Sequence, residues 1–150
     1  LSFAGVMCFW TGLLKVAEKS GLSQKIEKLL KPLIRFLFPR AGDESKKYIA
    51  MNMTANLLGM GNAATPMGIK AMQNLDKENK RPEYASDDMC MLVVLNTTSL
   101  QLIPTTIISL RVAAGSENPF SVVLPIWISS LCAVIAAVTC AKLYFGRKKL

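Results

Sequence analysis

The chain has 150 residues, room for one domain, and its 51% hydrophobic content with a mean hydropathy of +0.33 is high for a soluble protein. Its net charge of +8 lies between apolar runs, without aromatic interleaving or a nucleic-acid-binding motif, which argues against DNA or RNA as a partner. Histidine is absent, which excludes most metal sites and acid–base triads. We therefore expect an integral membrane protein without cofactor or metal, and an enzyme is the least favoured class.

The first two apolar stretches predict helices of different kinds. Leu1–Leu14 is uncharged but short, and we expect it to be the end of a transmembrane helix whose beginning is truncated. Leu22–Phe38 carries apolar residues at helical spacing, opposite a row of basic residues. This pattern predicts a basic amphipathic helix on the cytoplasmic membrane surface. The alternative is a core helix of a soluble protein, and Pro32 would kink either one.

The stretch Asn52–Met72 is apolar but interrupted at its middle. At 1.5 Å per residue the arm before Gly59 reaches about 16 Å, roughly half of a 30 Å hydrocarbon core. Gly59 and Gly61 suit the end of this first helix, because glycine readily takes positive φ. Thr65 and Pro66 predict the start of a second helix, as its N-cap and first helical residue. The segment therefore predicts a helix, an unwound turn and a second helix.

The rest of the chain predicts two further membrane segments. Gln73–Asp88 is a hydrophilic loop, and Met89–Leu110 is an apolar run with many polar side chains around Pro104, which predicts a kinked or discontinuous helix. A short loop at Arg111–Pro119 then leads to Val122–Phe145, the clearest spanning segment.

The basic segments suggest how these elements cross the membrane. If Lys15–Lys47 and the basic C-terminal tail are both cytoplasmic, an even number of crossings lies between them. Because three apolar segments lie there, one must return to its own side, and the broken stretch is the natural candidate. We therefore predict an all-α membrane protein with a single domain over residues 1–150. Its order is a spanning helix, an interfacial helix, a re-entrant helical hairpin, a kinked transmembrane helix and a straight one.

Polar residues gather around the two predicted helix breaks. Helix N-termini and unwound carbonyls at such breaks can bind polar solutes or ions. The alternative is that the amides only join helices by hydrogen bonds. The candidate substrate-binding residues are Asn52, Asn56, Gly61, Asn62, Thr65, Pro66, Asn96, Thr97, Thr98 and Gln101.

Three segments together resemble the nucleoside-recognition, or gate-domain, family of membrane proteins, in its spore maturation group. They are Asn52–Met72, Asn96–Ser99 with Ile103–Thr106, and Phe9–Gly21. The resemblance implies a multi-pass protein of the bacterial inner membrane, linked in spore formers to dehydration of the spore core. It also implies a homologous partner, a spore maturation protein B-like chain, or else a homo-oligomer.

The gate domain is shared with concentrative nucleoside transporters and ferrous-iron transporters. In the nucleoside transporters the same order of elements forms half of an inverted repeat, and the hairpin tip reads Gly-Gln-Thr-Glu-Ala-Pro-Leu. Gly61 and Pro66 match that tip and Asn62 replaces its glutamine, whereas Ala63 and Ala64 stand where the transporters have Thr and the ribose-binding Glu. Two functions stay open: a transport half-site for a small polar solute or ion, and a structural subunit whose polar tips only hold a partner.

Overall fold

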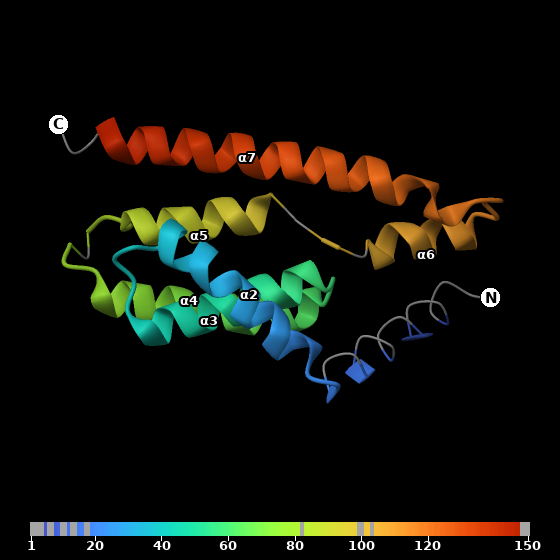
Figure 1. The fold of residues 1–150 in the computed structure, drawn as a ribbon, viewed down its shortest axis with the longest axis horizontal. Coiled ribbons are helices and arrows are strands. Elements are labelled where there is room, and N and C mark those ends of the chain that lie inside the picture. The colour runs from blue at the N-terminus through green and yellow to red at the C-terminus, as the bar shows by residue number, and fades with distance from the viewer. Residues whose placement is uncertain are drawn as a thin grey trace.

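The computed structural model describes residues 5, 8, 9, 12, 15, 16, 19–81, 83–98, 101, 102 and 104–147. Every regular element among them is a helix, as the predicted all-α class requires (Figure 1). The predicted helix end at Leu1–Leu14 lies mostly outside the described residues. The elements in chain order are α2 (Leu22–Leu37), α3 (Asp43–Leu57), α4 (Gly61–Glu78), α5 (Asp87–Thr97), α6 (Thr105–Ala113), the 3-10 helix η1 (Pro119–Val122) and α7 (Val123–Arg147).

Helices α3 and α4 form an antiparallel hairpin with a very short turn (Figure 1). Gly59 has φ +74°, which confirms its predicted role at the end of the first arm. The amide of Met60 donates to the carbonyl of Ala55 at 2.8 Å, and the amide of Gly59 donates to that of Asn56 at 3.0 Å. These two bonds make a Schellman motif, which satisfies the last carbonyls of α3 and reverses the chain at once.

The start of the second arm differs from the prediction. Helix α4 begins at Gly61, so Gly61 starts the second arm and does not end the first. Thr65 is therefore not the N-cap of α4, and Pro66 is inside the helix. The reason is that the amides of Ala63 and Ala64 already donate to the carbonyl of Met60, at 2.9 and 3.0 Å. The Schellman turn therefore leads directly into the helix, and the unwound turn is shorter than the sequence predicted.

The predicted discontinuous helix at Met89–Leu110 is confirmed. Helix α5 ends at Thr97, and α6 begins at Thr105 directly after Pro104. The amide of Leu102, in the break, donates to the carbonyl of Leu57 at the end of α3, at 2.8 Å. This bond holds the broken helix against the turn of the hairpin.

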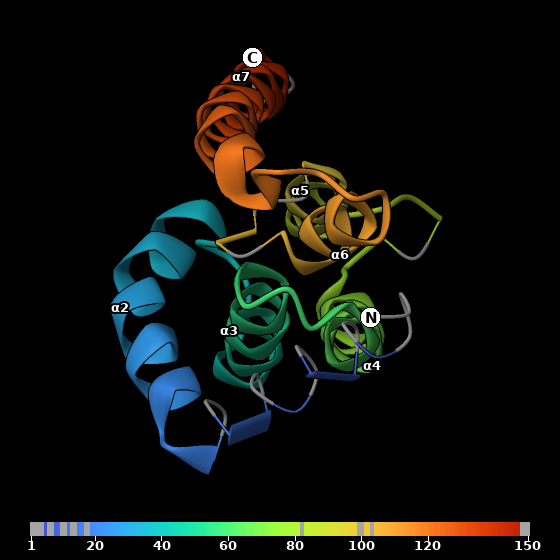
Figure 2. The same cartoon turned by 90° about the vertical axis from the view of Figure 1, so that its right-hand side faces the viewer.

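Helix α2 is amphipathic, as predicted, and it covers one side of α3. Leu30, Ile34 and Leu37 are buried, whereas Leu29 and Phe36 are exposed. Figure 2 shows α3 between α2 and α4, with α5 beside the hairpin and α7 outermost. The core is made by α2, the hairpin and α5, and its buried members are Leu30, Ile34, Leu37, Phe38, Ala41, Ile49, Ala50, Ala71, Leu75, Met91 and Leu92.

The C-terminal helix lies at the edge of the core, against which its Val138, Ala141 and Phe145 pack. The segment Pro119–Phe145 is 27 residues long and apolar enough to cross a membrane, and none of its most apolar window is buried. It is the one helix among the described residues that meets this test. Large apolar side chains such as Leu124, Ile128 and Leu131 are exposed along it. The predicted spanning segment Val122–Phe145 therefore corresponds to α7.

One end of the molecule collects the charged connections. The end of α2, both open ends of the hairpin, the start of α5 and the end of α7 lie there (Figure 1). Arg40 forms an ion pair with Asp87 at 3.0 Å. Glu78 at the end of α4 accepts hydrogen bonds from the amide of Gly42 and the hydroxyl of Ser45, both at 2.8 Å. The connection between α4 and α5 and the end of α7 thus lie at the same end (Figure 1). This connection is shorter than the predicted loop Gln73–Asp88, because α4 continues to Glu78 and α5 begins at Asp87.

Candidate functional site

The hairpin places two asparagines on one face of α3. Asn52 and Asn56 are one helical turn apart and therefore lie on the same face. Asn52 is only 3% exposed, and its Nδ2 donates to the carbonyl of Ala64 in α4 at 2.9 Å. This bond ties the two arms together near the turn.

A glycine that the sequence analysis missed makes room for this amide. A Cβ added to Gly68 would lie 2.9 Å from Nδ2 of Asn52 and 3.9 Å from Nδ2 of Asn96. Contacts under about 3 Å do not occur for real Cβ atoms, so only glycine leaves the Asn52 amide in place. The sequence did contain a signal for Gly68. A glycine inside a helix costs about 1 kcal/mol relative to alanine, and this cost suggests that packing requires it.

The third asparagine comes from the broken helix. Nδ2 of Asn56 donates to Oδ1 of Asn96 in the last turn of α5 at 2.9 Å. Asn52, Asn56 and Asn96, which we call the asparagine cluster, therefore come from α3 and α5 and meet at Gly68 of α4. The structure thus brings three of the candidate residues together, although they are separated by as much as 44 positions (96 − 52) in the sequence.

Two buried polar atoms of α3 are left without protein partners among the described residues. Oδ1 of Asn52 and Oγ1 of Thr54 are buried and have no hydrogen bond to the described residues. A buried acceptor left in this state costs about 1–3 kcal/mol. Native proteins rarely keep such groups unless a water, an ion or a ligand satisfies them. Amide oxygens can accept from a solute N–H or O–H and can also coordinate a cation, whereas amide nitrogens donate.

The other candidate residues play different parts. The hydroxyl of Thr65 donates to the carbonyl of Gly61 at 3.1 Å. Pro66 has no N–H, so the carbonyl of Asn62 receives no helical bond from it. The side chain of Asn62 lies outside the described residues. The polar groups at the hairpin tip are therefore backbone carbonyls, and no described side chain caps the start of α4.

The polar residues at the end of α5 are mostly satisfied within their own helix. The hydroxyl of Thr97 donates to the carbonyl of Val93, and that of Thr98 donates to the carbonyl of Leu95, both at 2.8 Å. Gln101 is half-buried in the break between α5 and α6. Neither threonine bonds the asparagine cluster.

An apolar groove reaches the asparagine cluster from the side of α7. It has a volume of about 310 Å³ and is walled by α2, α3, α5 and α7, with Asn56 and Asn96 on its surface. This volume is at the lower end of the range for small-molecule sites, about 300–1,000 Å³, which are mostly apolar with a few polar groups.

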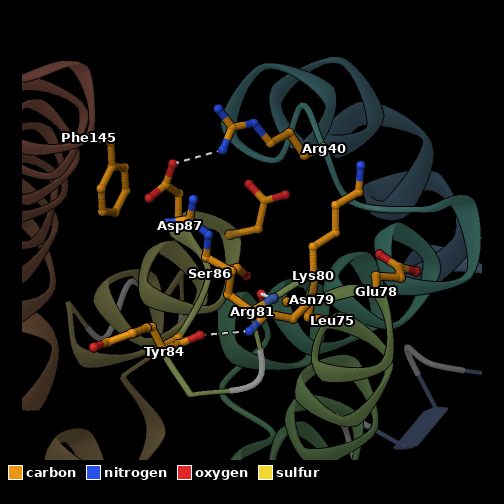
Figure 3. Close-up of a pocket in the computed structure, with 12 residues that line it drawn as sticks. Arg40, Leu75, Glu78, Asn79, Lys80, Arg81, Tyr84, Ser86, Asp87 and Phe145 are labelled. Atoms are coloured by element: carbon orange, nitrogen blue, oxygen red, sulfur yellow. Dashed lines mark hydrogen bonds and ion pairs between the residues drawn. The ribbon is translucent and has the colours of Figure 1, made fainter. Parts of the chain in front are cut away.

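The charged end holds a second and larger cavity of about 1020 Å³. Figure 3 shows Arg40 reaching toward Asp87, with Phe145 of α7 beyond it. Asp88 is 6% exposed, and burial raises its pKa, partly opposed by the positive charge of Arg40. The Arg40–Asp87 pair, and the hydrogen bond from Nδ2 of Asn79 to the carbonyl of Tyr84 at 2.7 Å, hold the connections between helices around this cavity.

A helical hairpin joined by polar contacts to a broken helix, beside an exposed apolar helix of spanning length, defines a helical membrane protein with a buried polar site. The family model described as "Gate: Nucleoside recognition" matches residues 1–114. The chain belongs to this gate family of nucleoside-recognition membrane proteins, which confirms the resemblance seen in its sequence.

A curated relative agrees with the family. The chain is similar to spore maturation protein A of Bacillus subtilis (strain 168), with 39% identity over 146 residues, which cover 96% of this chain and 74% of that protein. No solved structure matches the chain.

Proposed function

We propose that the chain is one half of a two-component transporter or channel-like complex for a small polar solute or ion. In this proposal it is a multi-pass protein of the bacterial inner membrane, has no enzymatic activity, and serves dehydration of the spore core in spore formers. The partner is a homologous chain of the spore maturation protein B type, or a second copy. The similarity of this chain to spore maturation protein A supports the proposed role in spore formers.

The observation that carries the proposal is the buried, unpartnered Oδ1 of Asn52 within the asparagine cluster. Around it the chain brings together Asn56 and Asn96, and the carbonyl of Asn62 nearby lacks a bond from Pro66. Such a set of oxygen acceptors next to helix ends suits a polar solute or a cation.

A re-entrant hairpin explains why a partner is needed. In this proposal α3 and α4 enter the membrane from the charged end and return to it, so their turn lies near the midplane. The start of α3 is charged, and its uncharged part, residues 48–57, has 10 residues (57 − 48 + 1), which at 1.5 Å per residue is about 15 Å, half of a 30 Å core. A second, inverted half would cover the remaining depth.

Flux measurements on reconstituted protein test the proposal. Vesicles containing the chain and its homologous partner should take up radioactive sodium or radiolabelled uridine faster than empty vesicles. Asn52→Leu removes the unpartnered acceptor and should abolish this uptake, whereas Cys132→Ala, on the exposed surface of α7, should leave it unchanged. If the Asn52→Leu protein takes up solute as fast as the native protein, the asparagine cluster is not part of the transport pathway.

A second function is favoured by the bond between Asn56 and Asn96. These amides satisfy one another, as expected for residues that only hold two helices together, with a contribution of about 0.6–2 kcal/mol. In that case the chain is a structural subunit of the membrane complex. Loss of melting temperature in parallel with loss of complex formation, with no flux in the native protein, would support this function instead.

A further inference from the structure

We propose that the apolar groove between α2 and α7 binds an anionic phospholipid, with an acyl chain along α7 and the phosphate at Lys142. The inference does not depend on what the asparagine cluster binds. The groove walls include Leu33 and Phe36 of α2, Met53 of α3, and Ile135 and Val138 of α7. An acyl chain would complete the packing that these side chains lack.

The polar groups on the groove surface do not require a polar occupant. Asn56 donates to Asn96, and the hydroxyl of Thr139 donates to the carbonyl of Ile135 at 2.7 Å. The rest of the lining is apolar. Because α7 is exposed along its most apolar window, the groove opens toward the hydrocarbon that surrounds a spanning helix.

The charged end of the groove suits a phosphate. A neighbouring cavity of about 180 Å³ shares Leu37 with the groove and is lined by Lys142 and Arg40. The ammonium of Lys142 donates to the carbonyl of Phe36 at 2.8 Å and lies 3.9 Å from the centre of its ring. An ammonium has three donors, so Lys142 keeps others for a phosphate oxygen.

The charge around this end favours an anionic lipid. Asp87 also lines the smaller cavity, but its charge is compensated by Arg40 at 3.0 Å. Asp88 lines it as well and is buried, with its pKa raised by burial. Basic side chains such as Lys142 at the end of a spanning segment attract anionic lipids.

The distance along α7 fits the two parts of a phospholipid. Ile135 and Lys142 are seven residues apart, which is about 10 Å along a helix at 1.5 Å per residue. The apolar contact therefore lies in the hydrocarbon when Lys142 lies at headgroup level, where lysine side chains extend to reach the interface.

Native mass spectrometry of the full chain tests the proposal. The protein is released from nanodiscs that contain phosphatidylglycerol and phosphatidylcholine in equal amounts, and the lipids that stay bound are counted. The native chain should keep phosphatidylglycerol in preference to phosphatidylcholine. Ile135→Trp fills the groove and should reduce the retained lipid at least fivefold. Lys142→Gln should lower the preference for phosphatidylglycerol about fivefold, which corresponds to about 1 kcal/mol per basic residue.

Matched controls separate the groove from general effects. Leu131→Trp places the same side chain on α7 outside the groove, and Lys28→Gln removes a charge from the outer side of α2; both should behave as the native chain. If Ile135→Trp fails to fold, Leu33→Trp closes the groove from α2. Retention that is equal in the groove variants and the native chain overturns the proposal. So does cross-linking of the groove to a second copy with no lipid retained.

Discussion

Nδ2 of Asn56 donates a hydrogen bond of 2.9 Å to Oδ1 of Asn96, and this bond joins the hairpin to the helix that breaks one residue later. The amide of Leu102 supports the same junction by donating to the carbonyl of Leu57 at 2.8 Å. The indole of Trp127 on α7 then donates to the carbonyl of Leu102, also at 2.8 Å. Three separate parts of the chain are thus held together where both breaks occur.

The Asn56–Asn96 bond can be tested as a site or as a structural link. We expect the single change Asn96→Leu to abolish flux while lowering stability by only about 0.6 kcal/mol, the average for such bonds in membranes. Thermal unfolding in detergent and vesicle uptake measure the two effects. If each change acts only by removing this bond, the double variant Asn56→Leu/Asn96→Leu should have the same melting temperature as the less stable single variant. A proportional loss of melting temperature and flux contradicts the site.

Gly68→Ala should disturb the asparagine cluster from α4. Its Cβ would lie 2.9 Å from Nδ2 of Asn52 and so displace the amide from the carbonyl of Ala64. The broken buried bond costs about 1–3 kcal/mol, which exceeds the gain of about 1 kcal/mol from replacing a helical glycine. Melting temperature should fall. Gly61→Ala meets nothing within 4 Å and should not destabilise, and an equal effect of both changes would contradict the steric argument.

The turn of the hairpin should depend on Gly59. Its φ of +74° costs about 1–2 kcal/mol for a residue with a Cβ, so Gly59→Ala should destabilise by that amount. Gly115 has the same φ in an equivalent turn after α6 and serves as the matched comparison. Both variants should lose similar stability, but only Gly59→Ala should also reduce flux. Equal flux in the two variants would show that the turn at Gly59 has no specific part in transport.

Asp88→Asn should stabilise the protein at neutral pH. Burial raises the pKa of Asp88 above its ordinary value of 3.8, so the folded state favours the protonated form. The stability from this group is complete below the unfolded value and is lost as the pH rises through the folded value. Asparagine stays neutral and keeps an acceptor for the backbone of Arg40. The melting temperature at pH 7 should rise, and its decline as the pH increases through the raised pKa of Asp88 should weaken.

A neighbouring residue provides the control for Asp88. Asp87→Asn loses the ion pair with Arg40 at 3.0 Å, a partly exposed pair worth about 0–1 kcal/mol. It should lower the melting temperature slightly at neutral pH. A melting temperature for Asp88→Asn below that of the native chain would show that its charge stabilises the fold.

Cysteine labelling tests the arrangement in the membrane. In a background without the native cysteines, Ser86→Cys and Leu150→Cys should react with an impermeant maleimide from the same side of a vesicle. Ser116→Cys, in the connection after α6, should react from the opposite side. Labelling of Ser86→Cys and Ser116→Cys from one side would exclude the re-entrant hairpin.

Local chemistry determined the elements of this chain. The helical spacing in Leu22–Phe38 and the charge-free run after Val122 predicted α2 and α7, because burial and lipid exposure both follow hydrophobic pattern. Gly59 and Pro104 predicted the two breaks, because backbone conformation there depends on the residue itself. The spacing of Asn52 and Asn56 was enough to place them on one face of a helix.

Only the tertiary structure decided which polar groups meet. Asn96 reaches Asn56 because α5 packs against the hairpin, and Gly68 is required because the Asn52 amide crosses α4 there. Thr65 and Pro66 were misplaced as a helix start, because the hydrogen bonds of the preceding turn outweighed their local preference. Contacts between helices depend on packing among residues far apart in the sequence, and no local pattern specifies that register.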